Sequence, residues 1–157
     1  MMKKLVLTLT IAVCFTTFIN AQDYNNGIGL RVGLYNGLTF KHFLGSGPTV
    51  ELLASTRWSG FKVTGLYEIH NTAFNVDRLN WYFGVGAHVG FYNGDNTTWG
   101  DVGTAYTVVG VDGILGLEYN FTELPINIGI DWKPAFNIIG YSHFWPDGGA
   151  LSIRYIF

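Results

Sequence analysis

Eight segments of this sequence alternate apolar and polar residues with a period of two. The clearest segment, 79–92, reads LNWYFGVGAHVGFY, with large apolar side chains on one face and mostly polar or small ones on the other. A period of two is the pattern of a β-strand, whose successive side chains point to opposite faces. The sequence therefore predicts an all-β fold. The expected strands are 28–35, 38–44, 49–58, 61–70, 79–92, 106–121, 126–133 and 151–157, with a hairpin turn at Asn36-Gly37 after the first.

The face that carries the charged residues decides which kind of β-barrel these strands can build. The apolar face of the eight segments has no charged residue, and a Lys or Arg on a lipid-facing wall would cost about 2–4 kcal/mol at mid-membrane. A soluble barrel would show the opposite arrangement, with an apolar interior and charges outside. We therefore predict an eight-stranded antiparallel up-and-down transmembrane β-barrel. Its lumenal charges would be Arg31, Lys41, Glu51, Arg57, Lys62, Glu68, Asp112, Glu118, Asp131, Lys133 and Arg154.

The lumen of such a barrel is just wide enough for its own side chains to fill it. Because unpaired charges in a narrow lumen would be costly, charges of opposite sign should be neighbours there. We expect such neighbours among Arg31, Glu118, Asp131, Lys133 and Arg154. A filled lumen with a structural or surface-binding role is the favoured interpretation, and a narrow channel for small solutes or ions is the alternative.

The first 21 residues have the pattern of a cleaved secretory signal peptide. Lys3 and Lys4 precede an apolar stretch, 5–18, that is too short to prefer a spanning helix, and a small residue, Ala21, stands at the expected cleavage site. The barrel domain would then be 22–157, without the single cysteine of the sequence. Only 13% of the residues are charged, against roughly 25% in soluble domains, which also favours a membrane protein.

Two long segments, 93–105 and 134–148, follow the fifth and the seventh expected strand. Small transmembrane barrels have short periplasmic turns and longer external loops, so both segments should lie at the external end. Their aromatic residues Trp99, Phe144 and Trp145 are therefore expected to contact a surface partner, such as a glycan or lipopolysaccharide. Other aromatic residues near strand ends predict an interfacial girdle on the outer face: Trp58, Trp81, Trp132, Tyr155 and Phe157.

Three segments resemble small outer-membrane β-barrel proteins of Bacteroidota, relatives of the OmpX/OmpA-type barrels: LTFKHFL at 38–44, LNWYFGVGAHVGF at 79–91 and LPINIGIDWKP at 124–134. The resemblance rests on strand patterns and covers essentially all of the expected mature chain. It implies a place in the outer membrane of a Gram-negative cell, surrounded by outer-membrane lipid. It also implies insertion by the barrel-assembly machinery, which recognises a final strand that ends in an aromatic residue, here Phe157. It implies no activity.

The sequence contains no spacing of residues that is typical of a catalytic site or a metal site. The histidines are scattered without the spacing of a zinc site, and none is followed two positions later by the serine of lipid A deacylases. The glycines of 84–86 lie within a strand, so they build no phosphate loop and are expected to leave room for Tyr82 and Phe43. We expect no catalytic residue, cofactor, metal or nucleic acid, and a monomer. A membrane-embedded lipid-modifying enzyme is the second alternative.

Overall fold

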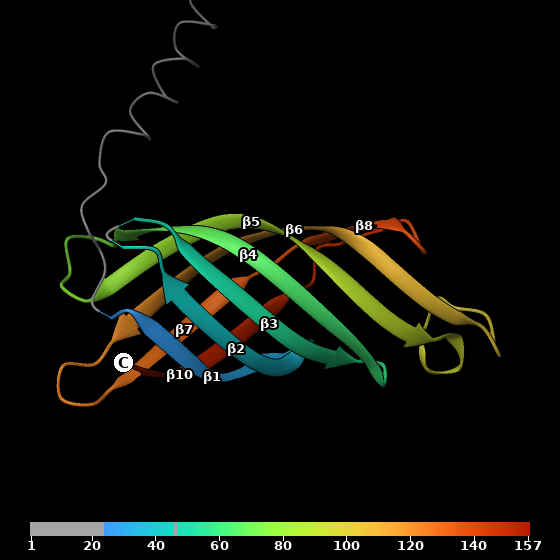
Figure 1. Cartoon of the computed structure of the whole chain (residues 1–157), viewed down its shortest axis with the longest axis horizontal. Coiled ribbons are helices and arrows are strands. Elements are labelled where there is room, and N and C mark those ends of the chain that lie inside the picture. Colours follow the sequence, from blue (N-terminus) through green and yellow to red (C-terminus); the bar gives the residue numbers. More distant parts are fainter. Residues whose placement is uncertain (1–23, 46) are drawn as a thin grey trace, which may run out of the picture.

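The structure is a computed structural model that describes residues 24–45 and 47–157, so the expected signal peptide at 1–21 lies outside the described residues. The described chain folds into a closed antiparallel β-barrel, seen from the side in Figure 1. Its strand segments are β1 (Asn26–Gly33), β2 (Asn36–Phe43), β3 (Thr49–Arg57), β4 (Gly60–Thr72), β5 (Leu79–Asn93), β6 (Ala105–Asn120), β7 (Ile126–Trp132), β8 (Ala135–Ile139), β9 (His143–Trp145) and β10 (Gly149–Ile156).

Consecutive strands are neighbours around the wall, and two pairings close the ring. β5 pairs with β6, and β10 returns to β1, so that Ile28 lies opposite Tyr155 on one side and opposite Phe40 on the other. Closure gives two partners to every strand segment except β9, which pairs only with β8, and so removes most of the exposed sheet edges that invite aggregation. The predicted all-β, eight-stranded antiparallel barrel is thus confirmed. All eight expected strands are present, and their ends differ from the expected ends by at most two residues.

The expected external loop 134–148 differs from the structure, because part of it is a β-hairpin made of β8 and β9. β6 pairs with β7 as far as Trp132 and with β8 from Ala135 onward. Pro134 stands between them and has no backbone N–H, so the wall strand is interrupted at that residue. β7 with β8 and β9 with β10 therefore form two interrupted strands, and the ten segments make an eight-stranded barrel.

The turn after β1 lies two residues earlier than the sequence predicts. Leu34 and Tyr35 form the connection, whereas Asn36 already belongs to β2 and accepts a hydrogen bond from the backbone N–H of Gly33 through its side-chain oxygen at 3.0 Å. The shift leaves Tyr35 with only 4% of its surface exposed. Tyr35 thereby becomes an interior residue at one end of the barrel.

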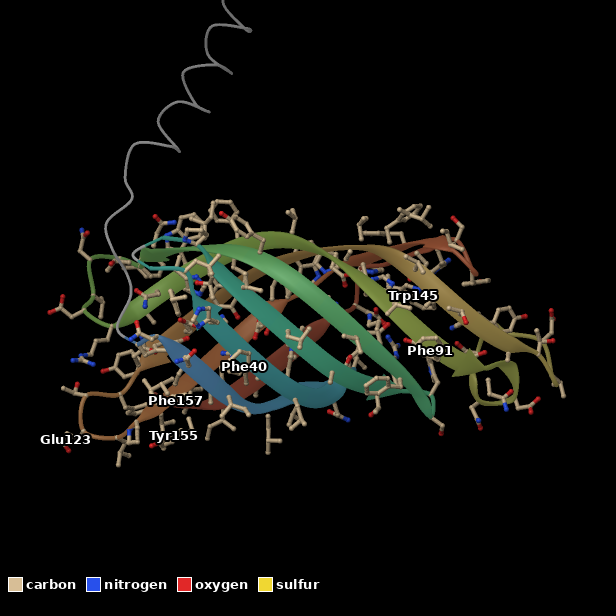
Figure 2. All side chains as sticks on the ribbon, viewed as in Figure 1. Phe40, Phe91, Glu123, Trp145, Tyr155 and Phe157 are labelled. Atoms are coloured by element: carbon tan, nitrogen blue, oxygen red, sulfur yellow. The ribbon has the colours of Figure 1, made fainter. Side chains whose placement is uncertain are left out.

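The two faces of the wall differ as the alternation predicts. Apolar side chains stand on the outer face, where Figure 2 labels Phe40, Phe91, Tyr155 and Phe157. Inward side chains of the same strands are mainly polar or charged and are buried. The described part of the chain contains no helix that is long and apolar enough to cross a membrane.

Glycine makes room for a large aromatic ring inside the barrel. Tyr82 lies opposite Gly116 in the pairing of β5 with β6, and a Cβ atom at Gly116 would stand 2.4 Å from Cζ of Tyr82. A Cβ atom at Gly84 or Gly86 would instead meet the backbone of β4, at 2.3 and 2.0 Å. The structure therefore assigns the space for Tyr82 to Gly116 rather than to the glycines of 84–86.

We predict that Gly116→Ala destabilises the barrel, because the new methyl group must displace the ring of Tyr82. Overpacking of this kind costs about 1–3 kcal/mol in the free energy of unfolding. The control is Gly65→Ala, where a Cβ atom meets nothing within 4 Å. The measurement is urea unfolding of each barrel in detergent micelles, followed by tryptophan fluorescence, and equal midpoints for the two variants would contradict the predicted packing.

Candidate functional site

Ten of the charged residues that the sequence assigns to the lumen are buried, each with at most 4% of its surface exposed. Nine of them lie on the inward faces of their strands, as the alternation predicts, and Lys133 points inward from the break between β7 and β8. Arg57 lies half-buried at the end of β3. Buried charges are expensive unless they are paired and hydrogen-bonded, so their partners define the interior. The ten are Arg31, Lys41, Glu51, Lys62, Glu68, Asp112, Glu118, Asp131, Lys133 and Arg154.

An apolar belt crosses the interior and divides these charges into two groups. Leu53, Leu66, Tyr82 and Ile114 form this belt, and all four are buried against one another. Along β4, Leu66 lies between Glu68 on one side and Lys62 on the other. Along β3, Leu53 lies between Glu51 and Arg57 in the same way. Water and ions would have to pass this packed belt to cross the barrel.

On one side of the belt lies the acidic cluster, in which three carboxylates share two cations. Lys41 Nζ lies 3.0 Å from Oε2 of Glu68 and 3.2 Å from Oε2 of Glu118. Arg154 pairs with Glu51 at 2.7 Å and approaches Glu118 at 3.8 Å. The acidic cluster therefore has one carboxylate more than it has lysine and arginine side chains.

The second group, the basic cluster, lies on the other side of the belt and has the opposite imbalance. Arg31 forms an ion pair with Asp131, and Lys133 forms one with Asp112. Lys62 completes the cluster, but among the described residues no carboxylate lies within 4.0 Å of its Nζ. Three cations thus accompany two carboxylates.

The ion pairs follow the sequence-based expectation in part. Among the five residues expected to pair, Arg31 meets Asp131 and Arg154 meets Glu118. Lys133 instead pairs with Asp112, a residue outside that group of five. Alternation determines whether a side chain points inward or outward. Its ion-pair partner depends on which other inward side chains lie at the same level of the closed barrel.

Aromatic rings cover the basic end of the barrel. We call Trp58, Tyr92, Trp99, Tyr141 and Trp145 the aromatic mouth, since all five lie in connections or near strand ends at this end. The ring centroids of Trp58 and Trp145 lie 5.3 Å apart, and Trp99 stacks on Tyr141 at 4.4 Å. Such ring pairs add about 0.5–1.5 kcal/mol each beyond the area that they bury. The mouth is therefore a packed aromatic layer rather than a set of independent loops.

Trp58 lies in this mouth and not in the outer girdle that the sequence predicts. Trp58 and Ser59 form the turn between β3 and β4, and both have a positive φ, 51° and 56°. Non-glycine residues rarely adopt this left-handed conformation. The turn directs the indole toward Trp99 and Trp145 at the rim.

The three expected loop contacts divide between two faces. Trp145 lies opposite Ala135, whose side chain is buried, and its ring packs in the mouth together with Trp99. Phe144 lies opposite Phe136, and both phenyl rings stand exposed on the outer face of the wall. Phe144 is therefore separated from the two tryptophans by the wall itself.

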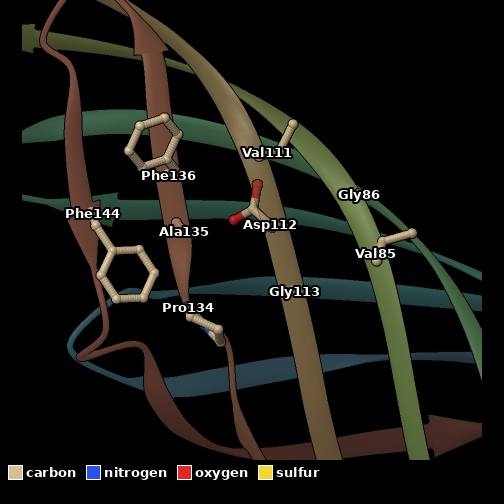
Figure 3. A pocket seen from close by; sticks show the side chains of 9 residues that line it. All are labelled: Val85, Gly86, Val111, Asp112, Gly113, Pro134, Ala135, Phe136 and Phe144. Carbon is tan, nitrogen blue, oxygen red and sulfur yellow. The ribbon is translucent and has the colours of Figure 1, made fainter. Parts of the chain in front are cut away.

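Phe144 borders an apolar groove of about 510 Å³ at the interrupted wall strand (Figure 3). The groove is hollow because Gly113 has no side chain there, and a Cβ atom at Gly113 would meet only Cγ of Pro134, at 3.6 Å. Asp112 reaches the floor of the groove, but its carboxylate is bound by Lys133 and His88. The full lining is Val85, Gly86, Val111, Asp112, Gly113, Pro134, Ala135, Phe136 and Phe144.

Several residues in or next to the mouth escape sequence reasoning. Tyr35 and Tyr92 have inward parity in the expected strands 28–35 and 79–92, so the alternation contains a signal for them. Tyr141 and Asp147 lie in irregular connections, where no periodicity indicates a direction. Among the described residues no group of three or more His, Cys, Asp or Glu could hold a metal ion.

Comparison with known proteins adds no family to this description. The chain matches no protein-family model, and a search of curated proteins finds no relative. The fold itself is compatible with small outer-membrane barrels. Any further assignment rests on the interior charges, the aromatic mouth and the outer face.

We predict that Asp131→Ala lowers the free energy of unfolding by about 3–5 kcal/mol, because it leaves Arg31 buried without its partner. The double variant Arg31→Met with Asp131→Leu should recover most of this loss, since neither charge remains. Asp147→Ala is the control, because this half-exposed partner of Arg57 should contribute about 1 kcal/mol or less. Urea unfolding in micelles compares them, and equal stability of Asp131→Ala and Asp147→Ala would contradict the prediction.

Proposed function

We propose that this protein is an integral outer-membrane β-barrel with a side-chain-filled lumen and a binding surface at its external end. The distribution of side chains over the closed wall carries the proposal. Outward residues of several strands, such as Leu30, Val85 and Ile130, are each more than half exposed and apolar. Monomeric soluble proteins rarely expose contiguous apolar patches larger than a few hundred Å². A lipid hydrocarbon environment would explain the exposed apolar outer face. Ion pairs explain how the interior can hold buried charges.

The aromatic mouth is the proposed external end. The longest connection, between β5 and β6, and the β8–β9 hairpin lie at this end, whereas the described chain begins and ends at the opposite one (Figure 1). Small outer-membrane barrels place their longer loops outside and their short turns on the periplasmic side. The same orientation follows from the resemblance to OmpX/OmpA-type barrels of Bacteroidota.

The packing of the lumen favours a structural and surface-binding role over a channel. Each member of the apolar belt has at most 4% of its surface exposed, and ion-paired clusters lie on both sides of it. At the mouth, by contrast, Nε1 of Trp99 and Nη1 of Arg57 are buried without a hydrogen-bond partner. A ligand would supply the missing acceptors if the rings that cover these donors shift to admit it. We therefore place the functional surface at the mouth, around Trp99 and Trp145.

Cysteine labelling tests the membrane location and the orientation. We predict that a membrane-impermeant maleimide labels Val102→Cys on intact cells, because Val102 lies beside the mouth with 88% of its surface exposed. Val76→Cys, in the turn at the other end and 46% exposed, should react only after the outer membrane is permeabilised. Labelling of Val76→Cys in intact cells would contradict the orientation, and recovery of the protein in the soluble fraction would contradict the membrane location.

A binding measurement tests the role of the mouth. We predict that Trp99→Ala with Trp145→Ala weakens binding of the purified barrel to lipopolysaccharide at least about tenfold, as loss of central aromatic anchors does in other interfaces. Trp81→Ala is the matched control, since Trp81 lies on the outer face away from the mouth. Heat-modifiable migration should show that all variants fold, and unchanged binding by the double variant would refute the role of the mouth.

A further inference from the structure

Lys62 is a buried lysine without a carboxylate partner. Its side chain points inward from β4, and only 3% of the residue is exposed. In the described part of the chain its Nζ has no carboxylate within 4.0 Å, and it lies 3.9 Å from the ring centroid of Tyr35. A desolvated cation–π contact contributes about 2 kcal/mol. An uncompensated buried ammonium costs several kcal/mol, so the aromatic ring alone does not balance it.

Two further cations approach the same ring of Tyr35. The guanidinium carbon of Arg57 lies 4.9 Å from the ring centroid, and Nζ of Lys133 lies 5.8 Å from it. Each of these cations already has its own carboxylate, because Asp147 holds Arg57 at 3.0 Å and Asp112 holds Lys133. Lys62 is therefore a third basic side chain just below the aromatic mouth, and it has no carboxylate of its own.

Arg57 connects this excess charge to the mouth. Only its Nη2 bonds to Asp147, and its Nη1 is buried without a partner. Its guanidinium lies 4.0 Å above the ring centroid of Trp58 and 5.7 Å from that of Trp145. A free guanidinium donor and an unpaired ammonium thus both lie near the ring of Tyr35, at the end where the aromatic surface begins.

We propose that Lys62 and Arg57 bind the oxyanion of a sugar, a phosphate or a carboxylate group, while the sugar ring contacts the aromatic mouth. One negative charge would balance the basic cluster, and an oxyanion matches the fork of a guanidinium and the donors of an ammonium. Aromatic faces and edges at Trp58 and Trp145 suit the apolar side of a sugar ring. This inference rests on the proposed function, because it takes the mouth as the ligand-binding end. It further specifies that the ligand carries a negative charge.

Lys62→Met is the informative variant. Without an oxyanion it should be at least as stable as the wild type, because it removes an uncompensated buried charge. Calorimetry of the full barrel in micelles would use inorganic phosphate, glucose 1-phosphate, glucuronate and neutral glucose as probes. We expect the three anions to bind the wild type, glucose 1-phosphate more tightly than phosphate, and Lys62→Met to weaken them at least about tenfold.

Two controls separate a specific site from general charge effects. Lys62→Arg keeps the cation and should bind the anions within a few-fold of the wild type. Arg78→Met removes a cation from the turn at the opposite end and should leave anion binding unchanged. If Lys62→Met does not fold, the urea midpoint of the wild type still tests the site, because glucose 1-phosphate at low concentration should raise it above the same concentration of neutral glucose at equal ionic strength.

The outcomes distinguish this inference from the proposed function. Equal anion binding by the wild type and Lys62→Met, or no anion binding at all, would overturn the oxyanion site. In that case, binding of lipopolysaccharide that still depends on Trp99 and Trp145 would support the proposed surface role without an oxyanion site. Anion binding that depends on Lys62, without any binding of lipopolysaccharide, would support the site and refute that role.

Discussion

Closure of the sheet is the constraint on which the rest of this structure depends. Because β1 pairs with β10 and β5 with β6, half of the side chains of every strand point into a space just wide enough to hold them. The outward half faces the surroundings of the barrel, because no further layer of the described chain covers the wall. A closed wall with an apolar outer face thus forces the charges inward, and a narrow lumen forces those charges to pair.

Pairing inside the lumen is nearly complete but uneven along the barrel axis. The acidic cluster has an additional carboxylate, and the basic cluster has an additional cation, Lys62. The belt around Tyr82 lies between them, so the two excess charges do not neutralise each other by direct contact. The interior is therefore polarised, with its positive end beneath the aromatic mouth.

Periodicity predicts the wall well and the ends of the barrel poorly. Inward and outward faces follow from alternation, which by itself places residues such as Glu118 and Arg154 in the lumen. The β8–β9 hairpin escapes this reasoning because Pro134 interrupts the alternation and the segments are short. Trp58 escapes it because the direction of its side chain depends on a left-handed turn. Ion-pair partners such as Arg31 with Asp131 and Arg154 with Glu51 escape it because they come from strands that are not neighbours in the wall.

The β8–β9 hairpin gives the mouth its rigidity. β9 pairs with β8, and Trp132 donates a hydrogen bond through Nε1 to the backbone oxygen of Pro146 at 2.6 Å, so both ends of the hairpin are fixed to the wall. Alternation along β9 then sends Trp145 over the lumen and Phe144 into the outer groove. The rings are held in place before any ligand arrives. A ligand that binds at the mouth would not have to order a loop. The conformational entropy of these residues is lost when the barrel folds, so it does not weaken binding.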